Sequence, residues 1–155
     1  MIIEIPGRSA LDIRNIVLDY NGTLANNGTI NENVKNKLLE LAKYYELYVL
    51  TADTYGSAAK ECADMPVALK TFPQEGAGLF KKKIVEELNP AHCACLGNGF
   101  NDVEMLTIAA LSIGVVGTEG MFAALAQHAD ILICNIEDGL DLFLNTKKIV
   151  ATLRS

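Results

Sequence analysis

Three polar stretches of this sequence combine residue types that could do chemistry together. Asp19 ends a short apolar run and is followed by the turn Tyr20-Asn21-Gly22-Thr23, while Thr51 ends a second apolar run. The third stretch is the loop Gly97-Asn98-Gly99-Phe100-Asn101-Asp102. A carboxylate after a buried strand, a glycine turn of backbone donors, a hydroxyl and an acidic glycine loop suit an anion together with a hard cation.

Apolar runs bounded by turn residues predict the strands that carry these stretches. They cover residues 14–19, 46–51, 67–70, 92–96, 111–115 and 130–134. Near-continuous apolar runs are typical of strands buried on both faces, as in a parallel sheet. Because ligands of such sheets bind beyond the carboxyl ends of the strands, we expect Asp19, Thr51 and the loop 97–102 to meet at one site.

Helical patterns lie between the apolar runs. Asn31 is the expected N-cap of a helix that has Val34, Leu38, Leu41 and Tyr45 on one face. Other apolar sets predict helices near residues 58–63, 80–88, 103–110, 121–128 and 140–143. An extra N-terminal hairpin is expected around Pro6-Gly7-Arg8, and a tight turn at residues 26–29. The alternation predicts a single α/β domain over residues 1–155, with a three-layer, Rossmann-like open parallel sheet.

Composition narrows the class of protein. The chain has 155 residues and a net charge of −6, and an acidic chain gains no counterion-release affinity for nucleic acid. No stretch resembles a secretory signal, and the longest apolar run is too short to span a bilayer, so we expect a soluble, cytoplasmic protein. Cys62, Cys93, Cys95 and Cys134 are expected to be buried free thiols; metal or redox use is the alternative.

The quoted stretches resemble a known superfamily. Asp19-Tyr20-Asn21-Gly22-Thr23-Leu24 is similar to the D-x-D-G-T-L signature of haloacid-dehalogenase-like (HAD) phosphotransferases, and closer still to the D-K-T-G-T-L of P-type ATPases. Three later segments, at residues 50–53, 81–86 and 97–102, resemble the P-type motifs L-T-G-D, K-x-x-I-V-E and G-D-G-x-N-D in the same order. The likeness covers residues 16–133 and implies a HAD-like fold.

The resemblance implies a role for each matched residue. Asp19 would attack phosphorus and become an aspartyl phosphate; the alternative is a structural cap. Gly22, Thr23, Thr51 and Ala52 would bind the phosphoryl oxygens. Lys81 would neutralise their charge, although its neighbours Lys82 and Lys83 leave that choice open. Magnesium would be held by a set of oxygens from Asp19, the Asn21 carbonyl, Asn98 and Asp102.

Two positions depart from the family pattern. Phosphatases of the superfamily carry an acid/base aspartate where this chain has Asn21, and an amide cannot exchange that proton. Asn98 stands where the family has a metal-binding aspartate, which predicts weaker Mg²⁺ binding. Asn21 therefore predicts slow turnover through a long-lived phosphoenzyme.

Two functions remain open from the sequence. The first is a Mg²⁺-dependent hydrolase or phosphotransferase acting on a phosphorylated small molecule or macromolecule. The second is a non-catalytic or regulatory phosphate-binding module that acts through partner contacts. The stretch from Thr23 to Thr51 has room for neither a cap nor a nucleotide-binding domain, so the site is expected to be capless and open. An open site leaves room for a homo-oligomer.

Overall fold

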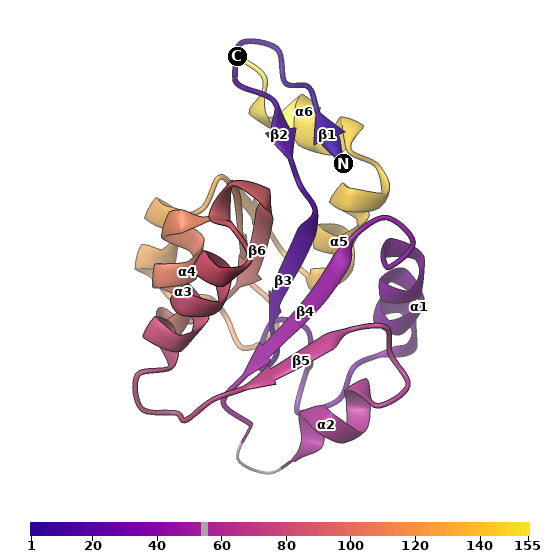
Figure 1. Ribbon diagram of the computed structural model, residues 1–155, viewed down its shortest axis with the longest axis vertical. Coiled ribbons are helices and arrows are strands. Elements are labelled where there is room, and N and C mark those ends of the chain that lie inside the picture. The colour runs from indigo at the N-terminus through magenta and orange to yellow at the C-terminus, as the bar shows by residue number, and fades with distance from the viewer. Residues whose placement is uncertain (54–55) are drawn as a thin grey trace.

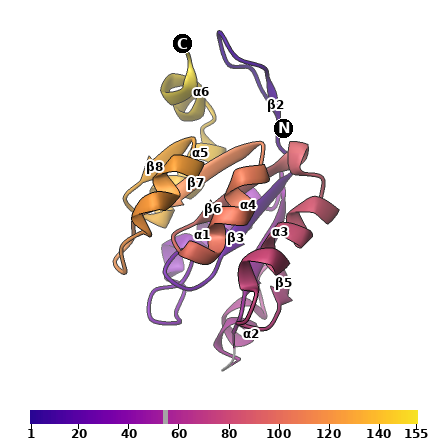
Figure 2. The ribbon, with the colours of Figure 1, turned by 90° about the vertical axis from the view of Figure 1, so that its left-hand side faces the viewer.

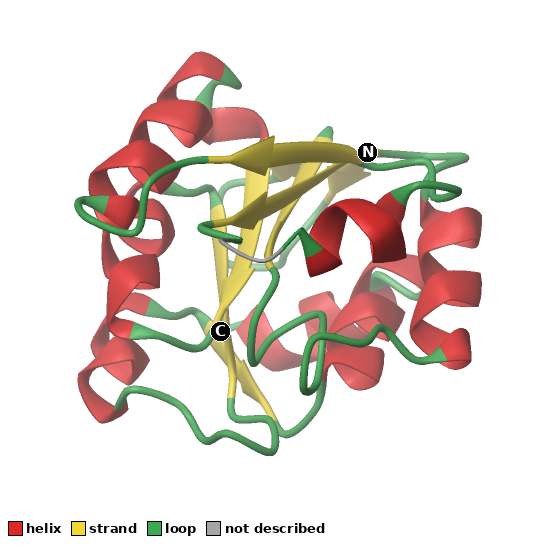
Figure 3. Cartoon of the chain, turned by 90° about the horizontal axis from the view of Figure 1, so that it is seen from below, coloured by secondary structure: helices red, strands yellow, loops and turns green. Residues whose placement is uncertain are grey.

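The computed structural model describes residues 1–53 and 56–155, and the fold is a six-stranded parallel sheet between two layers of helices. Figure 1 shows the sheet crossing the centre of the molecule, and Figure 3 shows helices on both of its faces. The strands run in the order β5-β4-β3-β6-β7-β8. Their bounds are β3 Asn15–Asp19, β4 Glu46–Thr51, β5 Ala68–Thr71, β6 Cys93–Gly97, β7 Leu111–Val115 and β8 Ile131–Ile133. The predicted parallel α/β sheet is confirmed.

Alternate residues of the central strands pack against different helical layers. Ile16 and Leu18 of β3 belong to the core under α1 (Glu32–Leu41) and α5 (Ile136–Leu144), whereas Val17 faces the opposite core. That second core lies under α3 (Ala77–Glu87) and α4 (Val103–Ile108), which Figure 2 shows side by side. Cys93 and Cys95 both face this layer, as their spacing predicted.

Several predicted local features are confirmed. The Asn31 side chain accepts a hydrogen bond from the Val34 N–H at 2.9 Å and caps α1. Asn26 and Thr29 exchange backbone hydrogen bonds across a tight turn, with Asn27 and Gly28 at positive φ. The N-terminal hairpin joins β1 (Ile2–Ile3) to β2 (Leu11–Asp12), and it lies beside the C-terminal residue, whose N–H donates to the Pro6 carbonyl. The helix α2 covers Ser57–Cys62.

Other expectations were wrong. Residues 123–128 form a 3₁₀ helix, because the segment buries Leu125 alone and has no side-chain cap to favour an α-helix. The chain also has a helix that was not predicted, α6 (Lys147–Leu153), which buries Ile149. Phe80 was expected on the core face of α3, but it is 42% exposed and stacks on Phe72. The thiol of Cys134 is exposed and not buried, while Cys62, Cys93 and Cys95 are buried free thiols as expected.

The segment between Thr23 and Thr51 contains the tight turn, α1 and β4, and no inserted cap domain lies between them. In the parts of the chain that the structure describes, no helix is long and apolar enough to cross a membrane.

Candidate active site

The candidate site lies where the order of the strands reverses. From β3 the chain passes through α1 to β4 on one side, and from β5 it crosses through α3 to β6 on the other. Asp19 ends β3 and Gly97 ends β6, and these two strands are neighbours. Parallel α/β sheets bind ligands at this crevice, because the loops diverge there to opposite faces.

Asp19, Lys81 and Asp102 form a buried cluster at this crevice. The Lys81 Nζ atom lies 2.6 Å from Asp19 Oδ1 and 2.6 Å from Asp102 Oδ1. It also donates a hydrogen bond to Asn101 Oδ1 at 3.3 Å. The Lys81 side chain is 1% exposed, because Ala77, Lys81 and Val85 form the buried face of α3. Lys81, and not the partly exposed Lys82, is therefore the lysine that reaches Asp19.

Both oxygens of Asp102 are engaged by protein groups. Oδ1 contacts Lys81, and Oδ2 accepts the backbone N–H groups of Asn98 and Gly99 at 2.9 and 2.8 Å. Gly97 makes this arrangement possible, since a Cβ atom at that position would lie 2.4 Å from Asp102 Cγ. In this structure Asp102 therefore shapes the loop and holds Lys81.

Burial dominates the electrostatics of the cluster. Burial raises the pKa of Asp19 to about 7, and the charge of Asp102 adds to the rise, while Lys81 and Thr23 act in the opposite direction. Burial lowers the pKa of Lys81, but the charges of Asp19 and Asp102 more than offset that effect, so its pKa is raised. One ammonium group thus faces two carboxyl groups, a pattern that favours a cationic lysine and a readily protonated Asp19.

Thr51 brings an unpaired hydroxyl to the same crevice. The side chain ends β4, one residue beyond the partner of Asp19, and is 1% exposed. Among the residues that the structure describes, its Oγ1 has no hydrogen-bond partner. A buried hydroxyl without a partner is costly, and a ligand oxygen placed in the crevice would relieve that cost.

The turn after Asp19 offers fewer free backbone donors than the motif implied. The Gly22 N–H donates to the Ala25 carbonyl at 3.0 Å, so it is engaged within the turn. The Thr23 N–H has no acceptor in the described residues, and the Thr23 hydroxyl donates to Asn98 Oδ1 at 3.1 Å. Gly22 has φ +78°, and a Cβ there would lie 2.6 Å from the Asn98 amide, so glycine is required.

These residues line one cleft of about 420 Å³. Of the residues proposed from sequence, the cleft contains Asp19, Asn21, Thr51, Ala52, Lys81 and Asn98. Gly22 and Thr23 lie beside it, and Asp102 lies beneath it. Four further lining residues, Gln74, Ala77, Gly99 and Asn101, were given no individual role from the sequence, and Glu119 lines the cleft as well. The position of Asn101 one residue before Asp102 was the available signal for its contact with Lys81.

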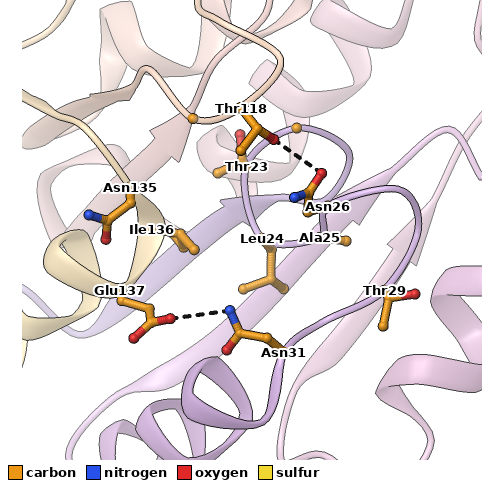
Figure 4. Close-up of a pocket in the computed structure, with 12 residues that line it drawn as sticks. Thr23, Leu24, Ala25, Asn26, Thr29, Asn31, Thr118, Asn135, Ile136 and Glu137 are labelled. Carbon is orange, nitrogen blue, oxygen red and sulfur yellow. Dashed lines mark hydrogen bonds between the residues drawn. The ribbon is translucent and has the colours of Figure 1, made fainter.

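A second cavity, of about 320 Å³, lies on the other side of the turn that follows Asp19 (Figure 4). Its polar side chains pair with one another: Thr118 donates to Asn26 at 3.1 Å, and Asn31 donates to Glu137 at 3.2 Å. These bonds tie the turn to the loop after β7 and to the start of α5. The side chains that line this cavity therefore hold the turn against its neighbours.

The donor set of the cleft fits a weakly held Mg²⁺ ion. Asp19 supplies a carboxylate, the Asn21 backbone a carbonyl oxygen and Asn98 an amide oxygen, and Glu119 adds a second carboxylate to the lining of the cleft. In residues 1–53 and 56–155 no group of three or more His, Cys, Asp and Glu side chains lies together. Mg²⁺ needs one or two carboxylates and keeps several waters, so this limited set is sufficient for the ion but not for tight binding.

Comparison with known structures identifies the fold. The phosphatase for 3-deoxy-D-manno-octulosonate 8-phosphate from Moraxella catarrhalis, crystallised with magnesium, phosphate and KDO, superposes with a TM-score of 0.73. The match has 15% identity and covers 92% of this chain and 94% of that one. A HAD-family hydrolase structure from Streptomyces avermitilis gives 0.70, with 15% identity over 85% and 84% of the two chains. The chain has the haloacid-dehalogenase-like (HAD) fold.

Sequence comparison places the chain more narrowly. It is 42% identical over 78 residues to the uncharacterised protein MJ0073 of Methanocaldococcus jannaschii, a match that covers 48% of this chain and 84% of that protein. The chain belongs to the same family as this archaeal protein. A 49-residue stretch is 43% identical to the phospholipid-transporting ATPase neo1 of Schizosaccharomyces pombe, over 32% of this chain and 5% of the ATPase. No protein-family model matches the chain.

Proposed function

We propose that the protein is a Mg²⁺-dependent phosphohydrolase or phosphotransferase that works through an aspartyl phosphate at Asp19. The observation that carries the proposal is that Asp19, the Lys81 ammonium and the unpaired Thr51 hydroxyl line one cleft. A nucleophile, a cation and a hydroxyl donor are the groups that a phosphoryl group needs around it. The phosphate and magnesium in the related Moraxella catarrhalis structure support this reading.

In the proposed reaction a carboxylate oxygen of Asp19 attacks phosphorus, and the bond from phosphorus to the alcohol oxygen breaks. The leaving alcohol takes its proton from solvent, because Asn21 has no proton to give. Water then attacks the phosphorus of the aspartyl phosphate and gives its proton to solvent, the bond from phosphorus to the Asp19 oxygen breaks, and phosphate leaves with the carboxylate restored. Lys81 and Thr51 stabilise the phosphoryl oxygens, and the Thr23 N–H is a further donor.

We assign the magnesium ligands more narrowly than the sequence motif does. The proposed ligands are Asp19, the Asn21 carbonyl and Asn98, and the bound ion would neutralise phosphoryl charge. We propose that Asp102 mainly positions Lys81 and the loop, since Oδ1 contacts Lys81 and Oδ2 accepts two backbone N–H groups.

A second candidate function is a phosphate-binding module without turnover. It is favoured by Asn98, whose side chain is engaged by the Thr23 hydroxyl and by the Gly120 carbonyl, at 3.1 Å each. Such a neutral, internally bonded side chain leaves the cleft with less attraction for a metal ion. A module of this kind would bind phosphate and signal through its open surface.

A phosphomonoester panel with Mg²⁺ distinguishes the two functions. The proposed enzyme releases phosphate from at least one ester, and Asp19→Asn abolishes the release. It also binds beryllium fluoride, a mimic of the aspartyl phosphate, in the wild type and not in Asp19→Asn. A wild-type protein that neither releases phosphate nor binds the fluoride complex contradicts the proposed reaction.

A further inference from the structure

An apolar slot of about 430 Å³ continues the polar cleft along the start of α3. Gln74, Ala77 and Asn101 line both the cleft and the slot, so the two hollows share a wall. A molecule whose phosphate lies at Lys81 can therefore extend into the slot without leaving the surface of the protein.

Two glycines and three apolar side chains line most of the slot. Gly76 and Gly78 contribute backbone without side chains, and Gly78 lies so close to the loop after β6 that a Cβ there would sit 3.3 Å from the Asn101 carbonyl oxygen. The apolar side chains are those of Leu79, Phe100 and Val103. An apolar lining that includes the exposed ring of Phe100 suits an aromatic group, because aromatic rings pack favourably on one another.

The apolar side chains of the slot are unusually exposed. Phe100 is 75% exposed and Leu79 is 66% exposed, while the only partner ring of Phe100 among the described residues is Phe122, edge-to-face at 5.3 Å. Exposed apolar groups gathered next to a polar cleft are typical of a binding surface. The one acidic lining residue, Glu104, pairs with Lys82 at 3.4 Å, so the slot itself carries no unpaired charge from that carboxylate.

The slot lies within reach of the reacting atoms. Ala77 is four residues before Lys81 on the same face of α3, which is about one helical turn, or roughly 5.4 Å. On the other wall, Phe100 directly precedes Asn101, whose Oδ1 accepts a hydrogen bond from Lys81. A ring joined to the phosphate by two or three bonds spans this separation.

We propose that the slot binds the leaving group of the substrate, and that the substrate is a phosphomonoester whose alcohol carries an uncharged aromatic ring. This inference rests on the proposed function, since it assigns the substrate class of the same site. In this proposal Phe100 and Leu79 recognise the leaving group of the substrate. Neither residue takes part in the chemical step.

The test compares 2-phenylethyl phosphate with ethyl phosphate. Both esters release a primary alcohol, so their chemistry is matched and the ring is the difference between them. The proposal predicts a kcat/KM for the phenyl ester higher by on the order of tenfold. Phe100→Ala and Leu79→Ala should each reduce that ratio towards one. Tyr44→Ala removes a 58% exposed aromatic side chain that lines neither hollow, and it should leave the ratio at the wild-type value.

The corresponding phosphonates separate this proposal from the proposed function, because they bind without being cleaved. The slot predicts tighter calorimetric binding of 3-phenylpropylphosphonate than of propylphosphonate, and Phe100→Ala should remove the difference. Turnover of both esters with equal kcat/KM overturns the slot and leaves the enzyme. A phosphonate preference without any turnover supports the slot and refutes the enzyme, and absence of phosphonate binding overturns the slot.

Discussion

The Lys81 Nζ atom lies 2.6 Å from Asp19 Oδ1, and the same ammonium is shared with Asp102 at 2.6 Å. Two carboxyl groups and one ammonium leave the cluster with an excess negative charge whenever both acids are ionised. This excess raises the pKa of Asp19, together with the larger effect of burial. It also opposes the approach of a phosphate anion, so the proposed reaction needs a cation beside Asp19.

The Asp19 pKa predicts a pH-dependent stability for the metal-free protein. The folded pKa of about 7 lies above the ordinary value of 3.8, so the folded state binds the proton more tightly than the unfolded state. This contribution to stability is complete below pH 3.8 and is lost as the pH rises through 7. Relative to Asp19→Asn, the wild type should lose on the order of 1 kcal/mol per pH unit in that window.

Urea unfolding at several pH values between 4 and 8 measures this difference. Circular dichroism is a suitable probe because the chain contains no tryptophan. Asp138→Asn, which changes an exposed carboxylate at the start of α5, is the control and should follow the wild type. A wild-type curve parallel to that of Asp19→Asn at all pH values would show that the Asp19 pKa is not raised.

Removal of the Lys81 charge should abolish turnover and destabilise the fold. Lys81→Met leaves Asp19 and Asp102 buried without their cation, a change that typically costs about 3–5 kcal/mol. Lys82→Met is the matched control, since Lys82 is 35% exposed and its contact with Glu104 is worth at most about 1 kcal/mol. Phosphate release and urea unfolding check both variants. Loss of turnover in Lys82→Met, together with an active Lys81→Met, would show that Lys82 and not Lys81 is the lysine needed for the reaction.

Restoring the family aspartate at position 98 should strengthen Mg²⁺ binding. Asn98→Asp adds a carboxylate beside Asp19 but loses the amide donation to the Gly120 carbonyl, so the metal-free variant should be less stable by about 1 kcal/mol. Adding Mg²⁺ should then raise its melting temperature more than it raises that of the wild type. Asn27→Asp, in the tight turn outside the cleft, makes the same charge change and should show no larger Mg²⁺ shift than the wild type.

An aspartate at position 21 should accelerate turnover. Asn21→Asp supplies the proton-transfer group that the wild type lacks, and such a group is worth about 10²–10⁴-fold when it is well positioned. Asn21 is exposed at the mouth of the cleft, so the substitution leaves the core intact. Steady-state phosphate release measures the gain, and Asn21→Ser serves as a control without an acidic group. Equal rates of phosphate release for Asn21→Asp and Asn21→Ser would show that an aspartate at position 21 transfers no proton in the reaction.

Much of the scaffold could be predicted, because it depends on local patterns. Continuous apolar runs identified the six strands, and Asn31 identified the start of α1. Motif order placed Asp19, Thr51 and Lys81 in one cleft, where the structure has them. The strands and the meeting of Asp19 with Thr51 follow from burial periodicity and from the edge of a parallel sheet where strand ends meet, whereas the choice of Lys81 was implied by the resemblance to P-type motifs.

The remaining features depend on contacts between distant segments. Phe80 has the spacing of a core residue, but its ring stacks on Phe72, a neighbour that helical periodicity does not reveal. The contacts of Asp102 with Lys81 and with two amides of its own loop were not predicted from the sequence motif either. The slot beside Phe100 was not predicted from the sequence, because Leu79 and Phe100 come from separate elements.

The central claim, a covalent phosphoryl intermediate at Asp19, is tested most directly by trapping it. Wild-type protein is mixed with a phosphomonoester that it turns over and with Mg²⁺, quenched in acid, and digested for peptide mass spectrometry. The proposed reaction predicts a phosphoryl group on the peptide that contains Asp19, and its absence in Asp19→Asn. Phosphate release with no phosphoryl group at Asp19, or with one on a different residue, would contradict it.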